Sequence, residues 1–412
     1  MSRESGKRGI SVVVRPTIIQ PSSTAFRFEV LVSSKEDVDV LKPLFPEEKL
    51  EVGRTYEYHS TLEVFPLHVL EALLHFGARA RLYETIFTHS PVEATISGFN
   101  VAGYAFSIYM VVLDLNGKCP LGCPWCYASP SKSHGFRLDA ESLEKSLIRT
   151  LREVLADCKL REHCLAFVTL AIGGSGDPSA MEPGDLEKLL LTIGSALETV
   201  RQEEKLLVNL AFSTSDPAFI SDDTLRVLLD SAPVQLYDIE MSVSYKTPSE
   251  RSLIPPLKEE GYPGLVARAL RRALDTGFHV SMQLMLRSGM PLEEAREVAS
   301  IAREVTEHLE FWDSWNRFRL FLLRYYSVPW FSTFKPPSRD EAAKLTLEIA
   351  GYFDANHLTF DTCLATQLFE RPLYTLEKGR LWRVNLENGL SGRIEGCPRG
   401  RDCQVWLDAS KL

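Results

Sequence analysis

The run of nine residues from Cys119 to Tyr127 constrains this chain more than any other stretch, because it holds three cysteines, Cys119, Cys123 and Cys126. Two prolines and a glycine lie between the cysteines, and residues of these types interrupt a helix. The run is therefore predicted to be a loop whose fixed turns bring three thiolates toward one point. Cysteine thiolates hold the iron of iron–sulfur clusters, and ordinary clusters take four of them. A local set of three leaves one iron open to a further ligand.

The spacing of these cysteines, and the aromatic Trp125 before the third, resemble the radical S-adenosylmethionine (radical SAM) superfamily. The resemblance implies that the three cysteines bind a 4Fe–4S cluster whose open iron chelates S-adenosylmethionine. It also implies reductive cleavage of that cofactor to methionine and a 5′-deoxyadenosyl radical, with Trp125 packed by the adenine. Two other interpretations stay open. One is a zinc knuckle, although zinc normally takes four ligands, and the other is a cluster that only transfers electrons.

Length and composition limit the remaining choices. A chain of 412 residues exceeds one ordinary domain. No apolar run approaches the roughly 20 residues of a membrane span, and the N-terminus lacks the apolar core of a signal peptide. We therefore expect a cytoplasmic protein with no membrane partner, whose eight cysteines serve metal binding or catalysis rather than disulfides. The net charge of −9 argues against nucleic acid as the main partner without excluding it.

The chain divides into three predicted parts. Residues 1–103 mix short β-rich runs with two short helical patterns, and are expected to form a separate α+β domain of unknown role. Residues 104–356 alternate strands with amphipathic helices, which is typical of a parallel sheet or barrel. Residues 357–412 form a short extension that contains cysteines.

Six strands are expected in the middle part, each followed by a helix. The resemblance identifies this pattern as the partial (β/α)6 barrel of radical SAM enzymes, so the predicted fold class is α/β. The predicted strands are Ser107–Leu115, Leu165–Ile172, Leu206–Phe212, Gln235–Val243, His279–Leu286 and Phe318–Tyr325. In parallel barrels the loops after the strands share one face, where the chemistry gathers. The cysteine loop follows the first of these strands.

A glycine-rich turn follows the second strand. In the family, a turn at this place contacts the methionine amino group through backbone carbonyls and a following acid. Gly173 and Gly174 match that pattern, but Ser175 stands where the acid is expected, and Asp177 is the candidate to replace it. A tight turn between strand and helix is the alternative interpretation of the two glycines.

Later strand ends supply ribose and carboxylate contacts in the family. The candidates here are Ser213 and Thr214 after the third strand, and Ser242 and Ser244 in and after the fourth. Arg287 ends the fifth strand, and its guanidinium is a candidate to bind the methionine carboxylate. The alternative for Arg287 is a surface salt bridge. The polar stretch with Tyr245, Lys246 and Arg251 is expected to overlie the cavity. The sixth strand ends in Arg324, Tyr325 and Tyr326, which are candidates to face cofactor or substrate, with packing as the alternative.

Three cysteines lie in the last fifty residues, at Cys363, Cys397 and Cys403. They loosely resemble the SPASM and twitch extensions of radical SAM enzymes, which bind auxiliary clusters. A second iron–sulfur cluster, a zinc ion and unliganded cysteines are the three alternatives. Cys158 and Cys164 are not expected to be ligands.

The resemblance implies an enzyme that abstracts hydrogen from a substrate bound in the barrel, with electrons from a ferredoxin or flavodoxin-type reductant. A peptide or protein is the leading substrate class, because auxiliary-cluster extensions are frequent in peptide-modifying relatives. RNA modification and cofactor biosynthesis are alternatives. A non-enzymatic iron–sulfur or zinc protein that binds a partner through its N-terminal domain is the alternative from another class.

Overall fold

The computed structural model describes residues 26–60, 72, 75, 80–83, 95–96, 99–100, 105–126, 136–159, 164–200, 206–257, 261–309, 317–353, 357–369 and 381–393. Its largest feature is a nine-stranded sheet, whose order is β12-β11-β10-β9-β8-β7-β6-β13-β14. Six neighbouring strands run parallel in chain order: β6 (Ala105–Asp114), β7 (Cys164–Gly173), β8 (Leu206–Thr214), β9 (Leu236–Ser244), β10 (His279–Leu286) and β11 (Phe318–Arg324). The predicted α/β fold class is confirmed.

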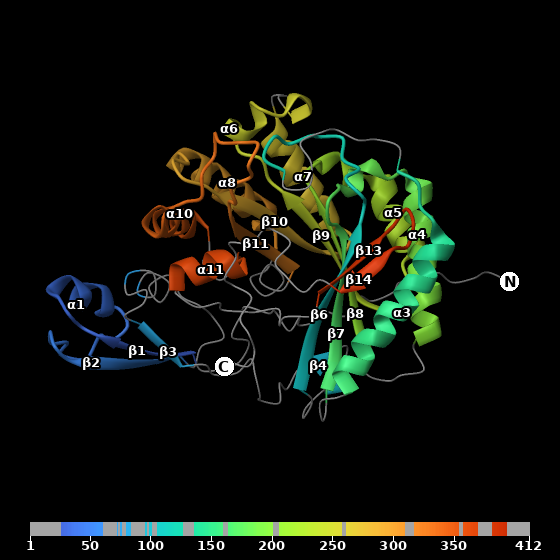
Figure 1. Cartoon of the computed structure of the whole chain (residues 1–412). Helices are drawn as coiled ribbons and strands as arrows, with labels where there is room; N and C mark the ends of the chain where they lie inside the picture. The colour runs from blue at the N-terminus through green and yellow to red at the C-terminus, as the bar shows by residue number, and fades with distance from the viewer. Residues whose placement is uncertain are drawn as a thin grey trace.

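Helices follow these strands and gather on one side of the sheet (Figure 1). They are α3 (Ala140–Lys159), α4 (Pro183–Val200), α5 (Asp222–Ser231), α7 (Tyr262–Asp275), α8 (Leu292–Thr306) and α10 (Arg339–Tyr352). Crossovers between parallel strands are right-handed, so strands laid down in one direction put every connecting helix on the same face. This is the arrangement of a partial (β/α) barrel, and it leaves the opposite, concave face of the sheet without helices from these crossovers.

Alternation along each strand separates the two faces of the sheet. In β8, Val208, Leu210 and Phe212 are fully buried under the helices, whereas Ala211 and Ser213 on the other face are only partly buried. Burial of a large aliphatic or aromatic side chain contributes roughly 1.5–3 kcal/mol, so the helix-facing rows supply most of the core stability. The concave face carries smaller and more polar side chains, which leaves it available for binding.

The C-terminal region also joins this sheet. The short β12 (Leu358–Phe360) pairs with β11, and β13 (Leu381–Asn385) pairs in parallel with β6. The antiparallel β14 (Ser391–Arg393) completes that edge. The predicted domain boundary at residue 356 therefore does not coincide with an end of the sheet, because backbone groups at both sheet edges find partners in later residues. Helix α11 (Thr362–Phe369) also belongs to this region.

A smaller antiparallel sheet lies in the N-terminal region and shares no strand with the large one in the described residues (Figure 1). It has the order β2-β1-β3, formed by β1 (Phe26–Leu31), β2 (Thr55–Ser60) and β3 (Ala80–Tyr83). Helix α1 (Lys35–Leu41) begins with a capping box of Ser34 and Asp37. The short pair β4 (Thr95–Ile96) and β5 (Phe99–Asn100) follows.

None of the helices in the described ranges is both long and apolar enough to cross a bilayer.

Candidate active site at the carboxyl edge of the parallel sheet

The cysteine loop begins at the carboxyl end of β6, as the sequence predicts. Cys119, Cys123 and Cys126 are all partly buried, and none is disulfide-bonded. The backbone N–H of Cys126 donates to the Cys123 carbonyl at 3.0 Å, which closes a turn between them. Each of Cys119 and Cys126 raises the pKa of the Cys123 thiol through charge repulsion, so the three sulfurs lie within electrostatic reach of one another.

Burial is the main cause that raises the pKa of Cys123 to about 12, and burial also raises that of Cys119. Buried thiolates of this kind need a compensating positive charge, which a bound metal centre supplies. Three cysteines of one loop supply the type of ligand that holds the iron of an iron–sulfur cluster.

The glycine-rich turn braces the cysteine loop. The backbone N–H of Asp177 donates to the Lys118 carbonyl at 2.8 Å, and that of Gly117 donates to Ser175 Oγ at 2.9 Å. Gly174 has a φ of +60°, and a Cβ there would lie 2.8 Å from Asp114 Oδ1. The glycines thus allow two loops to approach closely. Contact of Gly173 and Gly174 with a cofactor stays a prediction.

Asp114, the last residue of β6, is a site residue that the sequence analysis missed. It is fully buried and accepts hydrogen bonds from Ser175 N at 2.8 Å and Ser175 Oγ at 2.6 Å. Its other oxygen pairs with Arg383 of β13. Ser175, which stands in place of the expected acid, thereby joins the two loops. An acid at the end of an apolar strand was the one signal in the sequence, but its partner lies far along the chain.

Asp177 does not face an open space. Its carboxylate accepts hydrogen bonds from Thr214 Oγ1 at 2.7 Å, Ser215 N at 2.7 Å and Ser179 N at 3.0 Å. The residue is 4% exposed and caps the short 3₁₀ helix η2 (Pro178–Ala180). Its observed role is to connect the carboxyl ends of β7 and β8. Contact of Asp177 with the cofactor is untested, and these three bonds already use most of its acceptor capacity.

Replacing Asp177 with alanine is expected to lower the free energy of unfolding by about 2–3 kcal/mol, because it leaves buried donors without an acceptor. Thermal and urea denaturation measure this loss. Asp230→Ala, at an exposed position at the end of α5, is the control and should change stability by less than about 0.5 kcal/mol. Equal stability of the two variants would contradict the connecting role.

A row of polar side chains crosses the concave face beside the loops. Ser242 Oγ lies 2.6 Å from Ser281 Oγ and accepts from Gln283 Nε2 at 2.6 Å. Ser213 Oγ donates to Gln283 Oε1 over a longer 3.4 Å. Ser213, Ser242 and Ser281 occupy paired positions on three adjacent strands. The predicted candidates Ser213 and Ser242 are thus brought together, while Ser281 and Gln283 of β10 were not predicted.

Arg287 forms a buried ion pair rather than the surface salt bridge that was its alternative interpretation. Its guanidinium lies 2.6 Å from Glu294, and both side chains are less than a tenth exposed. It also lies over the Phe334 ring, 4.6 Å from the centroid. Binding of a methionine carboxylate by Arg287 stays a prediction, and it would have to share this cation with Glu294.

Two charged side chains, Lys246 and Glu250, lie within electrostatic reach of Cys123. Lys246 Nζ donates to Ser244 Oγ at 2.8 Å, and its charge lowers the pKa of Cys123 against the effect of burial. Glu250 is fully buried, and its Oε1 has no hydrogen-bond partner in the described part of the chain. The same holds for the hydroxyl of Tyr325, which lies within electrostatic reach of Glu250. Buried polar groups are normally hydrogen-bonded, so these two atoms keep unused hydrogen-bonding capacity in the protein interior.

Trp125 packs against aromatic side chains of the connection after β11. Its ring centroid lies 5.8 Å from that of Phe331 and 5.1 Å from that of Phe334, and the residue is 6% exposed. These contacts fix the cysteine loop against the later strands. The predicted packing of Trp125 by an adenine is untested.

Of the three tail cysteines, the structure describes only Cys363. It is the second residue of α11 and is partly buried, whereas Cys397 and Cys403 lie outside the described residues. The predicted second metal site therefore stays a prediction.

Cys158 is disulfide-bonded in the structure, which differs from the expectation that the cysteines would not form disulfides.

No known protein-family profile matches this chain. No curated protein sequence matches it either.

Comparison with solved structures finds similar folds at low identity. SuiB of Streptococcus suis bound to the precursor peptide SuiA is 16% identical over 64% of this chain, with a TM-score of 0.42. This chain spans 51% of that structure's length. The enzyme anSMEcpe with bound AdoMet is 14% identical over 68% of this chain and 72% of its own, with a TM-score of 0.42. Coproporphyrinogen III oxidase (HemN) of Escherichia coli, a radical SAM enzyme, is 14% identical over 68% of this chain and 63% of its own, with a TM-score of 0.37.

Proposed function

We propose that this chain is a radical SAM enzyme in which Cys119, Cys123 and Cys126 bind a 4Fe–4S cluster. The observation that carries the proposal is the placement of three partly buried cysteines, none in a disulfide, on one loop at the carboxyl edge of a parallel sheet. When bound, the cluster and S-adenosylmethionine supply reductive cleavage of the cofactor and a radical that abstracts hydrogen. A ferredoxin or flavodoxin-type protein is the proposed reductant.

The chain's own residues orient these groups and exclude water. Two hydrogen bonds hold the cysteine loop against the glycine-rich turn: Asp177 N–H donates to the Lys118 carbonyl, and Gly117 N–H donates to Ser175 Oγ. The aromatic contacts of Trp125 cover the loop from the side of β11. The row of Ser213, Ser242 and Gln283 provides hydrogen-bond donors and acceptors on the concave face, as ribose or substrate hydroxyls require.

The proposed substrate is a peptide or protein. The support for this class is the set of tail cysteines, which loosely resembles auxiliary-cluster extensions. RNA modification and cofactor biosynthesis remain alternative reaction classes, and the net charge of −9 weighs against a long nucleic-acid backbone.

The test is whether the iron-reconstituted, dithionite-reduced chain cleaves S-adenosylmethionine. We expect methionine and 5′-deoxyadenosine in equal amounts by liquid chromatography, and neither product without reductant. Cluster assembly without any cleavage would overturn the proposal and favour a non-enzymatic iron–sulfur protein.

A further inference from the structure

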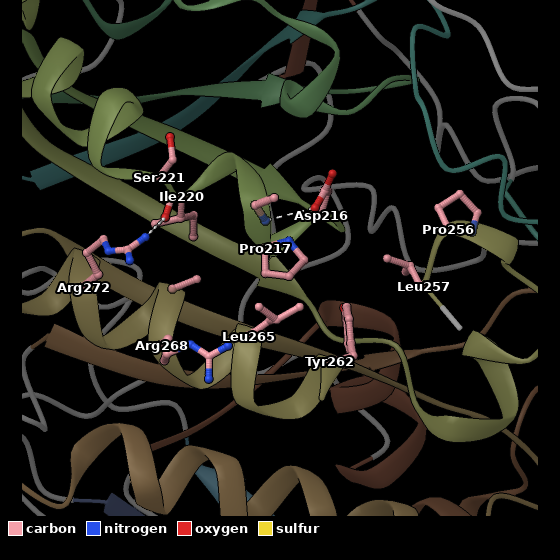
Figure 2. Close-up of a pocket in the computed structure, with 12 residues that line it drawn as sticks. Asp216, Pro217, Ile220, Ser221, Pro256, Leu257, Tyr262, Leu265, Arg268 and Arg272 are labelled. Atoms are coloured by element: carbon pink, nitrogen blue, oxygen red, sulfur yellow. Dashed lines mark hydrogen bonds between the residues drawn. The ribbon is translucent and has the colours of Figure 1, made fainter. Parts of the chain in front are cut away.

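A cavity of about 250 Å³ lies outside the mouth of the barrel, between the connection after β8 and helix α7. We call it the rim pocket; Figure 2 shows its lining residues, which are Asp216, Pro217, Ala218, Ile220, Ser221, Pro256, Leu257, Tyr262, Leu265, Arg268, Ala269 and Arg272. Its volume is below the roughly 300–1,000 Å³ of pockets for drug-sized ligands. The rim pocket therefore suits one or two side chains rather than a whole cofactor.

The rim pocket has both apolar and charged lining residues. Leu265, Arg268, Ala269 and Arg272 share one face of α7, because residues three and four apart are neighbours on a helix. Leu265 is 41% exposed and lies on this face with the exposed Arg268 and Arg272, whereas Ala269 is buried. Pro217 and Leu265 lie between the charged ends of the pocket in Figure 2. An apolar side chain placed here would cover the exposed leucine.

The charges of the rim pocket are separated. Arg268 and Arg272 lie at one end, and Asp216 lies toward the other (Figure 2). Arg272 is held by Asp222 at 2.8 Å and by the Ile220 carbonyl at 3.3 Å. Arg268 lines the rim pocket and makes no hydrogen bond or ion pair with any residue that the structure describes. The chain as a whole has a net charge of −9. A guanidinium in that position is a ready partner for a carboxylate.

Asp216 defines the opposite end. Its Oδ1 accepts from Ala218 N at 3.0 Å, and its Oδ2 has no hydrogen-bond partner in the described residues. Burial raises the pKa of this carboxyl, and the charge of Asp177 adds to the effect. The Asp216 carboxyl oxygen would repel the carboxylate of a ligand, but it can accept a hydrogen bond from an amide N–H. A ligand that satisfies both ends therefore carries an N–H group, an apolar group and a carboxylate, which is the pattern of a peptide.

We propose that the rim pocket binds a peptide segment in which an acidic side chain follows an apolar one, with the carboxylate on Arg268 and the apolar side chain against Leu265. This inference rests on the proposed peptide substrate, and it adds a docking site and a sequence preference. The pocket begins two residues after the end of β8, so a segment bound there lies beside the mouth of the barrel.

The test uses ligand-observed NMR titration of the full chain, without added iron or S-adenosylmethionine. The probes are acetyl-Phe-Glu-amide, its uncharged analogue acetyl-Phe-Gln-amide, and acetyl-Ala-Glu-amide. We expect the Phe-Glu probe to bind about tenfold more tightly than the Phe-Gln probe, because only the former forms a charge-assisted pair. The variant Arg268→Gln should remove that preference.

Matched variants separate the pocket from general charge effects. Arg271→Gln removes an arginine of the same helix that pairs with Glu304 outside the pocket, and it should keep the preference. Leu265→Ser should weaken the Phe-Glu probe severalfold, whereas Leu191→Ser, at another exposed leucine, should not. No binding of any probe at millimolar concentration would overturn the inference, as would an equal effect of the two arginine variants.

The cofactor-cleavage assay is independent of this titration. Cleavage of S-adenosylmethionine without probe binding would contradict the inference that the rim pocket binds a peptide, and it would still support the proposed function. Probe binding without cleavage of S-adenosylmethionine would support the rim pocket as a peptide site and contradict the proposed radical SAM activity.

Discussion

Replacing Cys119, Cys123 and Cys126 together with alanine is expected to abolish formation of 5′-deoxyadenosine and to remove about four irons per chain. The physical reason is that cysteine thiolates hold the iron of such a cluster, and the triple variant removes all three cysteines of the loop. Iron and sulfide analysis after anaerobic reconstitution measures the loss, and circular dichroism verifies that the variant is folded. Retained cleavage in the triple variant would contradict the assignment of the cluster ligands.

The Cys363→Ala variant is the matched comparison, because Cys363 is partly buried like the loop cysteines but lies in α11. It should keep the cleavage of S-adenosylmethionine. If the tail holds a second 4Fe–4S cluster, the wild-type chain should contain about eight irons and the Cys363→Ala variant fewer. About four irons with one zinc per chain would indicate that the tail cysteines bind zinc. About four irons without zinc would contradict a second metal site in the tail.

Replacing Gly176 with alanine is expected to have the second-largest effect. A Cβ at this position would lie 2.5 Å from Leu115 Cβ and 2.5 Å from the Lys118 carbonyl oxygen. The second contact is with backbone next to Cys119, so it cannot be relieved by a side-chain rotation. Overpacking of this kind typically costs about 1–3 kcal/mol. We expect a lower free energy of unfolding by about 2 kcal/mol and iron loading below half of the wild-type value.

Gly184→Ala is the matched control, because Gly184 lies in the first turn of α4 and a Cβ added there would have nothing within 4 Å. Alanine is favoured over glycine in helices, so this variant should be as stable as the wild type or slightly more stable. Thermal denaturation and iron analysis of both variants test the close approach of the two loops. Equal iron loading in both would show that the glycine-rich turn does not position the cysteine loop.

The hydrogen-bond partners of Asp177 could not be predicted from its neighbours in the sequence. The position of Asp177 after two glycines predicts contact with a cofactor, yet its carboxylate is used by Thr214, Ser215 and Ser179. The spacing of residues indicates which loop an acid belongs to. It does not indicate which donors the fold brings to that acid, because Thr214 belongs to the next strand and becomes a neighbour only when the sheet forms.

The order of strands and helices, and the position of the cysteine loop after β6, could be predicted from the sequence. These depend on short-range properties, namely apolar periodicity and the turns set by proline and glycine. Three features could not be predicted from the sequence: β13 pairs with β6, Arg383 reaches Asp114, and Lys246 and Glu250 lie within electrostatic reach of Cys123. Edge pairing and buried charge contacts join residues far apart in the chain, and their energy exists only after the sheet has placed them within reach.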